Sequence, residues 1–179
     1  MAMLIPIVRK SWGHLLIEVA PALWIILLLF TFPLTIFGTL GMRYAFLNNA
    51  AHLAASLGAQ CKTFQANVSS TDLSAVNMAN QAAEQAVAAF SGISLDQVST
   101  CIVVCPIGGS TVTRQSTPLT SPANTSLNTY NFEVVLQAQI QPLMNGSSSF
   151  FGSIPGLTGP LTTSAKADIF FENTQGLNQ

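Results

Sequence analysis

The stretch VAPALWIILLLFTFPLTIFGTLGM, residues 19–42, carries no charged residue and decides the fold of this chain. A helix needs about 20 apolar residues to cross the hydrocarbon core of a bilayer, and this stretch exceeds that length. The apolar region of a cleaved secretory signal is shorter, about 7–15 residues. We therefore expect residues 14–42 to form the transmembrane part of an N-terminal helix that the mature protein retains.

The charges that flank this stretch set its expected orientation. Arg9 and Lys10 are the only charged residues before Glu18. Basic residues beside a membrane helix stay on the cytoplasmic side. The N-terminus is therefore expected in the cytoplasm, and the C-terminal bulk outside it. Arg43, on the other flank, is a weaker signal in the opposite direction.

The composition excludes two broad classes of protein. The chain has 179 residues, of which 49% are hydrophobic and 7% charged, with a formal net charge of −1 and a mean hydropathy of +0.47. Disorder along the whole chain requires low hydrophobicity and high net charge, which this sequence lacks. A nucleic-acid partner is not expected, because no cluster of basic residues is present to neutralise phosphates.

Helical character continues beyond the apolar stretch. Residues 43–60, RYAFLNNAAHLAASLGAQ, contain no proline and are rich in alanine and leucine, which favour helix. We expect one helix from about residue 14 to 60, kinked at Pro33, whose second part lies outside the cytoplasm. Small residues recur at every fourth position and predict a close-packed surface; they are Ala50, Ala54 and Gly58 in one row, and Ala51, Ala55 and Ala59 in the next.

A second helix is predicted after residue 69. Ser69 and Asp72 have the spacing of a capping box, and Gly92 is a natural stop. One face of this helix is apolar at helical spacing; its residues are Leu73, Val76, Ala79, Ala83, Val87 and Phe90.

Farther along, the hydrophobic period changes from helical to two. Residues 130–141 and 161–172 alternate between apolar and polar side chains, which is typical of half-buried strands. Residues 99–105, rich in β-branched types and ended by Pro106, predict a third strand. One-sided strands of this kind favour an antiparallel sheet. The expected fold is therefore α+β, with residues 61–179 forming an extracytoplasmic domain built on three or more antiparallel strands.

Two long loops, residues 107–129 and 142–160, separate the expected strands. Loops of this length are usually functional or mobile. The second loop carries an apolar group that either docks a partner or, as we favour, folds back over the sheet; it comprises Phe150, Phe151, Ile154 and Leu157.

The three cysteines are Cys61, Cys101 and Cys105. Outside the cytoplasm they can form disulfides. In an extended strand Cys101 and Cys105 would be roughly 13 Å apart at 3.3 Å per residue, too far to bridge. Cys61 could pair with either one, and a local link remains open if the chain turns between the other two. A metal site is the weaker interpretation, because His14 and His52 are not placed to help.

No catalytic pattern is present, and neither an enzyme nor a cofactor is expected. The sequence contains no glycine-rich phosphate loop, no HExxH and no GxSxG. No histidine follows residue 60. We expect the carboxylates of this part to be solvated, with a paired-carboxylate site as the open alternative; the three on the polar faces of strands are Glu133, Asp168 and Glu172.

One ionisable residue does not suit a simple anchor. Glu18 lies at the edge of the apolar span, where a charge is costly and indicates a functional partner. Gly13 precedes it by five residues, in the run GHLLIE at residues 13–18, directly after the short basic leader. A glycine, four intervening residues, a glutamate and a long apolar helix form one connected pattern.

This pattern resembles the class III signal of type IV pilin-like proteins. Within that superfamily the chain is most similar to the TadE-like minor pilins, or pseudopilins, of tight-adherence pili. The similar stretch runs from Gly13 to about Gln60 and includes Pro21, the apolar span and the alanine-rich helix. The resemblance implies a pilin-like fold and a structural role in a bacterial pilus.

The resemblance also implies how the N-terminus is used. Residues 1–13 would be a leader with Arg9 and Lys10 as its basic flank, and a prepilin peptidase would cut after Gly13 to make His14 the new N-terminus. Glu18 would then pair with the terminal amine of a neighbouring subunit. Implied partners are the peptidase, other pilins or pseudopilins, the inner-membrane assembly platform and membrane lipid. The implied location is the bacterial inner membrane, as a single-pass protein, and the pilus itself.

Two other functions compete with this interpretation. The first is an unprocessed, single-pass periplasmic binding module that uses its long loops for a ligand. The second is an anchored enzyme, which the missing catalytic patterns disfavour. The state of the N-terminus separates the pilin hypothesis from the first of these.

Overall fold

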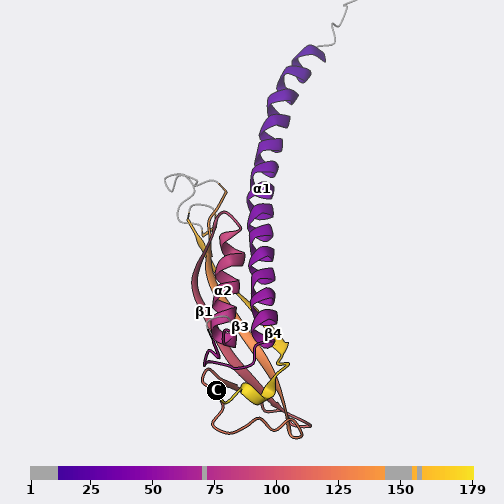
Figure 1. The fold of residues 1–179 in the computed structure, drawn as a ribbon. Helices are drawn as coiled ribbons and strands as arrows, with labels where there is room; N and C mark the ends of the chain where they lie inside the picture. The colour runs from indigo at the N-terminus through magenta and orange to yellow at the C-terminus, as the bar shows by residue number, and fades with distance from the viewer. Residues whose placement is uncertain (1–11, 70–71, 144–154, 157–158) are drawn as a thin grey trace, which may run out of the picture. The chain divides into compact units, whose positions relative to one another are not determined.

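The computed structural model describes residues 12–69, 72–143, 155–156 and 159–179, with residues 12–18 described by their backbone alone. Figure 1 shows the two helices and the sheet. The chain divides into two compact units, residues 1–38 and 39–179. The elements in chain order are α1 (Trp12–Ala59), α2 (Ala75–Ala88), β1 (Ile93–Pro106), β2 (Thr113–Gln115), β3 (Asn128–Ile140), β4 (Leu161–Phe170) and the short 3-10 helix η1 (Thr174–Gly176).

The second unit confirms the α+β class and the antiparallel sheet. Its four strands lie in the order β2-β1-β3-β4, and every neighbouring pair is antiparallel. The two strands with clear alternation, β3 and β4, lie where the sequence predicts them. β1 begins six residues earlier than the expected start at residue 99, and β2 forms inside the expected loop 107–129. Three-residue β2 is too short to show a period of its own.

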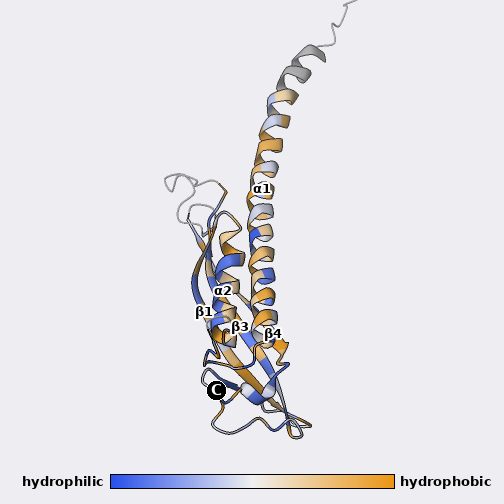
Figure 2. Cartoon of the chain, viewed as in Figure 1, coloured by the Kyte–Doolittle hydropathy of each residue, from blue (hydrophilic) through white to orange (hydrophobic). Residues whose placement is uncertain are grey.

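Helix α1 is continuous and close to its predicted length. It runs through Pro21 and Pro33 without interruption. In the first unit most of its large apolar side chains are exposed, with Leu34 at 73% and Phe30 at 70% of full exposure, whereas Ile36 is buried. Within the described residues, α1 is the one helix long and apolar enough to cross a membrane (Figure 2).

In the second unit, α1 and α2 cover one face of the sheet (Figure 1). The six small residues predicted to pack, three in each row, are all buried. Phe132 of β3 lies at the centre of the core, with edge-to-face contacts to Phe64 and Phe171 at ring-centroid distances of 6.2 and 5.8 Å. Alternation in β3 therefore works as expected, because its even-numbered residues fill this core.

The start and end of α2 differ from the sequence prediction. Ser74, not Ser69, is its N-cap, and the buried Ser74 hydroxyl accepts a hydrogen bond from the backbone N–H of Asn77. The Ser69 hydroxyl accepts from the Asp72 backbone N–H at 3.0 Å, so the predicted spacing closes a turn that precedes the helix. Gly92 does not end the helix either. It lies beyond the C-cap Ala89, in the turn into β1, with a φ of 80°.

Gly58 marks the closest approach of α1 to the sheet. A Cβ atom at this position would lie 2.2 Å from Cε1 of the Phe132 ring. The helix can pack at this distance only because residue 58 has no side chain. Gly41, in the same helix, has open space around the corresponding position.

The two glycines make a matched test of this packing. We expect Gly58→Ala to lower the free energy of unfolding by about 1–3 kcal/mol, because the added methyl overpacks the core. Gly41→Ala should be neutral or stabilising by up to about 1 kcal/mol, because alanine favours helix. Chemical unfolding of the full-length chain in one detergent measures both. Equal effects of the two substitutions would contradict the assigned packing.

Candidate functional site

The residues of the predicted processing site lie at the start of α1. Gly13 and His14 are in its first turn, and Glu18 follows in the same helix, so all three positions have helical backbone. The structure describes no side chain among them, and Arg9 and Lys10 lie outside the described residues. The pairing of Glu18 and the cleavage after Gly13 therefore stay predictions.

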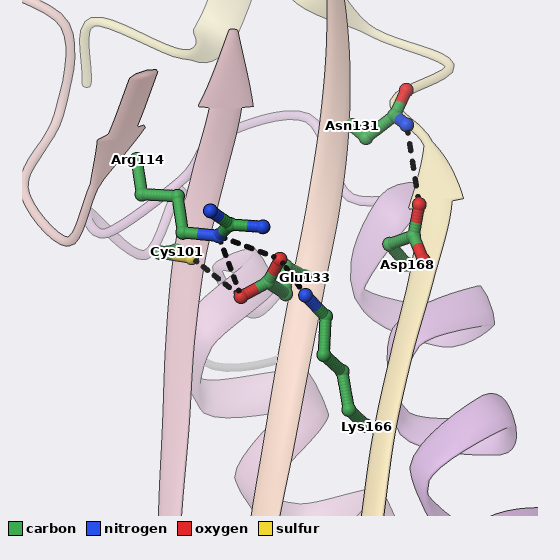
Figure 3. A network of polar contacts seen from close by, with 6 residues as sticks. All are labelled: Cys101, Arg114, Asn131, Glu133, Lys166 and Asp168. Carbon is green, nitrogen blue, oxygen red and sulfur yellow. Dashed lines mark hydrogen bonds and ion pairs between the residues drawn. The ribbon is translucent and has the colours of Figure 1, made fainter. Parts of the chain in front are cut away.

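The described residues do contain one concentrated polar site, on the sheet face opposite the helices. Glu133 of β3 lies at its centre, and both helices lie behind the strands in Figure 3. The prediction that Glu133 is solvated is wrong, because only 5% of this residue is exposed. Asp168 and Glu172 are exposed as expected.

Three side chains, one from each of the other three strands, surround the Glu133 carboxylate (Figure 3). Arg114 of β2 donates from Nε to both oxygens, at 3.2 and 3.1 Å. Lys166 of β4 lies 2.7 Å from Oε2, and the Cys101 thiol of β1 donates to Oε1 at 3.6 Å. The register explains this gathering: Cys101 lies directly opposite Glu133, and Lys166 pairs with the next outward-facing residue, Val135.

Charge fixes the protonation states at this site. Burial raises the pKa of Glu133, but hydrogen bonds and positive charge from Lys166 and Arg114 outweigh burial, so its pKa falls below the ordinary value. For Cys101, burial and then the Glu133 carboxylate raise the pKa to about 11. At neutral pH the site holds a paired carboxylate and a protonated thiol. The thiolate is the nucleophilic form of cysteine, so this arrangement favours neither base catalysis nor attack by sulfur.

Instead, the ion pairs of this site link β2 and β4 to β3. β2 is an edge strand of three residues, and Arg114 joins it to β3 across β1. The site was not predicted from the sequence. The three residues of β2 are too few to show an alternating pattern, and the alternation in β3 placed the Glu133 side chain on the face expected to be solvated. Alternation identifies the face of a side chain, and the burial of that face depends on its neighbours.

The sheet separates the cysteines that were expected to pair. Cys61 belongs to the core on the helix side, whereas Cys101 lies on the opposite face beside Glu133. All three cysteines are free thiols, so the expected disulfide is not formed in this structure. Cys101 and Cys105 both lie in β1 with no turn between them, which leaves no geometry for the local link.

The described part of the chain contains no group of three or more His, Cys, Asp or Glu residues that could hold a metal ion. Comparison of the chain with protein-family models, curated proteins and solved structures finds no match. The function of this chain is therefore inferred from its sequence pattern and from the geometry of its described residues.

The Glu133 site predicts a specific pH dependence of stability. A carboxylate with a lowered pKa stabilises the fold above its unfolded pKa, near 4.5, and that contribution disappears as the pH falls through the lower, folded value. Glu133→Gln should therefore be less stable than the native chain at pH 7 and should lose less stability between pH 5 and pH 3. Thermal unfolding across this range measures both effects.

Asp168→Asn is the matched control, because Asp168 lies opposite Glu133 on the next strand but is exposed. It removes the same charge and should keep the native acid sensitivity. If both variants lost the same share of that sensitivity, the ion pairs of the buried Glu133 carboxylate would not be its cause.

Proposed function

We propose that this chain is a minor pilin or pseudopilin that helps to assemble or prime a type IV-like, tight-adherence pilus. The observation that carries the proposal is the continuity of α1. One helix contains the Gly13–Glu18 spacing, the uncharged stretch 19–42 and the packed surface of the second unit. Most described side chains of the first unit's part of α1 are exposed, and the second part packs in the core of the second unit. This arrangement suits a subunit that packs beside other subunits through its N-terminal part.

Cleavage after Gly13 would create the group that Glu18 needs. The new amine at His14 is positively charged, and Glu18 follows four residues, or about one helical turn, later. In a bundle of such helices the amine of one subunit pairs with Glu18 of its neighbour. An unpaired buried charge is costly, so this ion pair sets the axial register between subunits.

The position of Gly13 in the first turn of α1 also suits a cleavage site. Glycine is among the weakest helix formers, and the first turn of a helix lacks part of its backbone hydrogen bonding. The segment can therefore leave the helix at low cost and enter a peptidase. In this scheme residues 1–13 stay cytoplasmic, residues 14–42 span the bacterial inner membrane, and residues 43–179 lie outside the cytoplasm.

The first test is the mature N-terminus. In cells that contain a prepilin peptidase we expect the chain to begin at His14, because the peptidase removes residues 1–13. Mass spectrometry of the N-terminal peptide measures this, with cells lacking the peptidase as the control. An intact Met1 start in cells with the active enzyme would instead support an unprocessed, anchored binding module.

The second test addresses the charge pair. Glu18→Ala should leave membrane insertion intact and reduce incorporation into the pilus by more than tenfold, since removing one partner of a buried ion pair costs about 3–5 kcal/mol. The control Glu84→Ala removes an exposed carboxylate of α2 and should assemble normally. Quantitative blotting of sheared pili reports incorporation. Normal assembly of the Glu18→Ala variant would exclude the pairing.

A further inference from the structure

Arg43 is the first residue after the uncharged stretch, and the second unit holds its side chain in place. Its Nη1 donates a hydrogen bond to the backbone carbonyl of Gln141, just beyond β3. The guanidinium lies over Gly92, where a Cβ atom would be 2.5 Å from Arg43 Cζ. The Gln141 N–H in turn donates to the Gly92 carbonyl at 2.8 Å. α1, the turn into β1 and the end of β3 therefore meet at one arginine.

A cavity of about 230 Å³ opens beside this arginine. Its walls combine a cation with apolar surface, because the rings of Phe46 and Phe90 stack there with centroids 3.9 Å apart. The contact with Gln141 uses one of the five N–H groups that a guanidinium carries. The cavity is lined by Thr39, Met42, Arg43, Phe46, Phe90 and Ser91.

The position of this cavity along the membrane normal follows from the length of the apolar stretch. Residues 19–42 in one helix rise about 36 Å at 1.5 Å per residue, slightly more than the roughly 30 Å of a hydrocarbon core. With this stretch in a bilayer, Arg43 lies among the lipid headgroups on the side of the folded domain. The cavity then faces the phosphate layer with its cation and the upper acyl region with Met42.

We propose that this cavity binds one membrane glycerophospholipid. The phosphodiester lies on the Arg43 guanidinium, which suits phosphate because it presents several donors in one plane. The glycerol and the first acyl carbons lie against Met42 and the aromatic pair. The proposal rests on the membrane insertion of residues 19–42 and is independent of cleavage or polymerisation.

Native mass spectrometry of the full-length chain tests this directly. The chain is held in a micelle of a phosphate-free detergent, and dimyristoyl phosphatidylglycerol is titrated in. We expect one lipid to be retained per chain, with Arg43→Gln binding about tenfold more weakly, as for loss of a hydrogen bond to a charged group. Lys62→Gln, which removes an exposed cation just beyond the other end of the same helix, should bind like the native chain.

A second variant guards against a folding defect in Arg43→Gln. Ser91→Phe fills the cavity from an exposed position and leaves the contact between Arg43 and Gln141 in place. It should also lose the lipid, while its thermal unfolding stays native. Retention of the lipid by Ser91→Phe, or by a folded Arg43→Gln, would overturn the proposal.

Inorganic phosphate separates a lipid site from a simple anion site. A large excess of phosphate should not displace the lipid, because phosphate makes no contact with the apolar wall. Complete displacement would overturn the assignment to a phospholipid. Lipid binding that survives while pilus assembly fails would contradict the proposed function alone, and a chain that stays soluble without detergent would contradict membrane insertion.

Discussion

The cost of leaving the uncharged stretch 19–42 in water is the constraint on which the rest of this protein depends. Large apolar side chains surround α1 in the first unit, and among the described residues most of them are exposed, Ile36 being buried. An exposed apolar surface of this extent marks a site of contact with a membrane or with another protein, and the helix is long and apolar enough to cross a membrane. The same helix then changes character, and its second part presents alanine and glycine to a folded core. The residue types of this one helix therefore change between the exposed apolar part and the part that packs in the core.

Small residues on α1 and large residues on the sheet complement each other in the second unit. The ring of Phe132 fills the space that Gly58 leaves free. On the opposite face the sheet is polar, and a single carboxylate gathers charges from two other strands. The two faces therefore differ in their contacts: one packs against the helices, and the other carries the ion pair that links the short edge strand β2 to β3.

Two charged residues flank the apolar stretch, and their situations differ. Arg43 finds its partners inside the second unit, at the Gln141 carbonyl and over Gly92. In the proposed function, Glu18 finds its partner only in another subunit, after cleavage has created an amine. The Arg43 contact lies within the second unit, whereas the proposed Glu18 pair requires a second chain. This asymmetry links the proposed lipid site to the proposed pilus subunit.

The sequence by itself determined the elements whose pattern is local and repeated. It predicted α1, the small-residue surface from Ala50 to Ala59, the strands β3 and β4 and the α+β class, because helical and strand periods appear directly in the order of residues. Only the tertiary structure decided that Ser74 caps α2, that Glu133 is buried and that Cys61 lies across the sheet from Cys101. The last two depend on residues far away in the chain, such as Arg114 and Lys166 around Glu133. A period identifies the face to which a side chain points, and only the packed fold decides what covers that face.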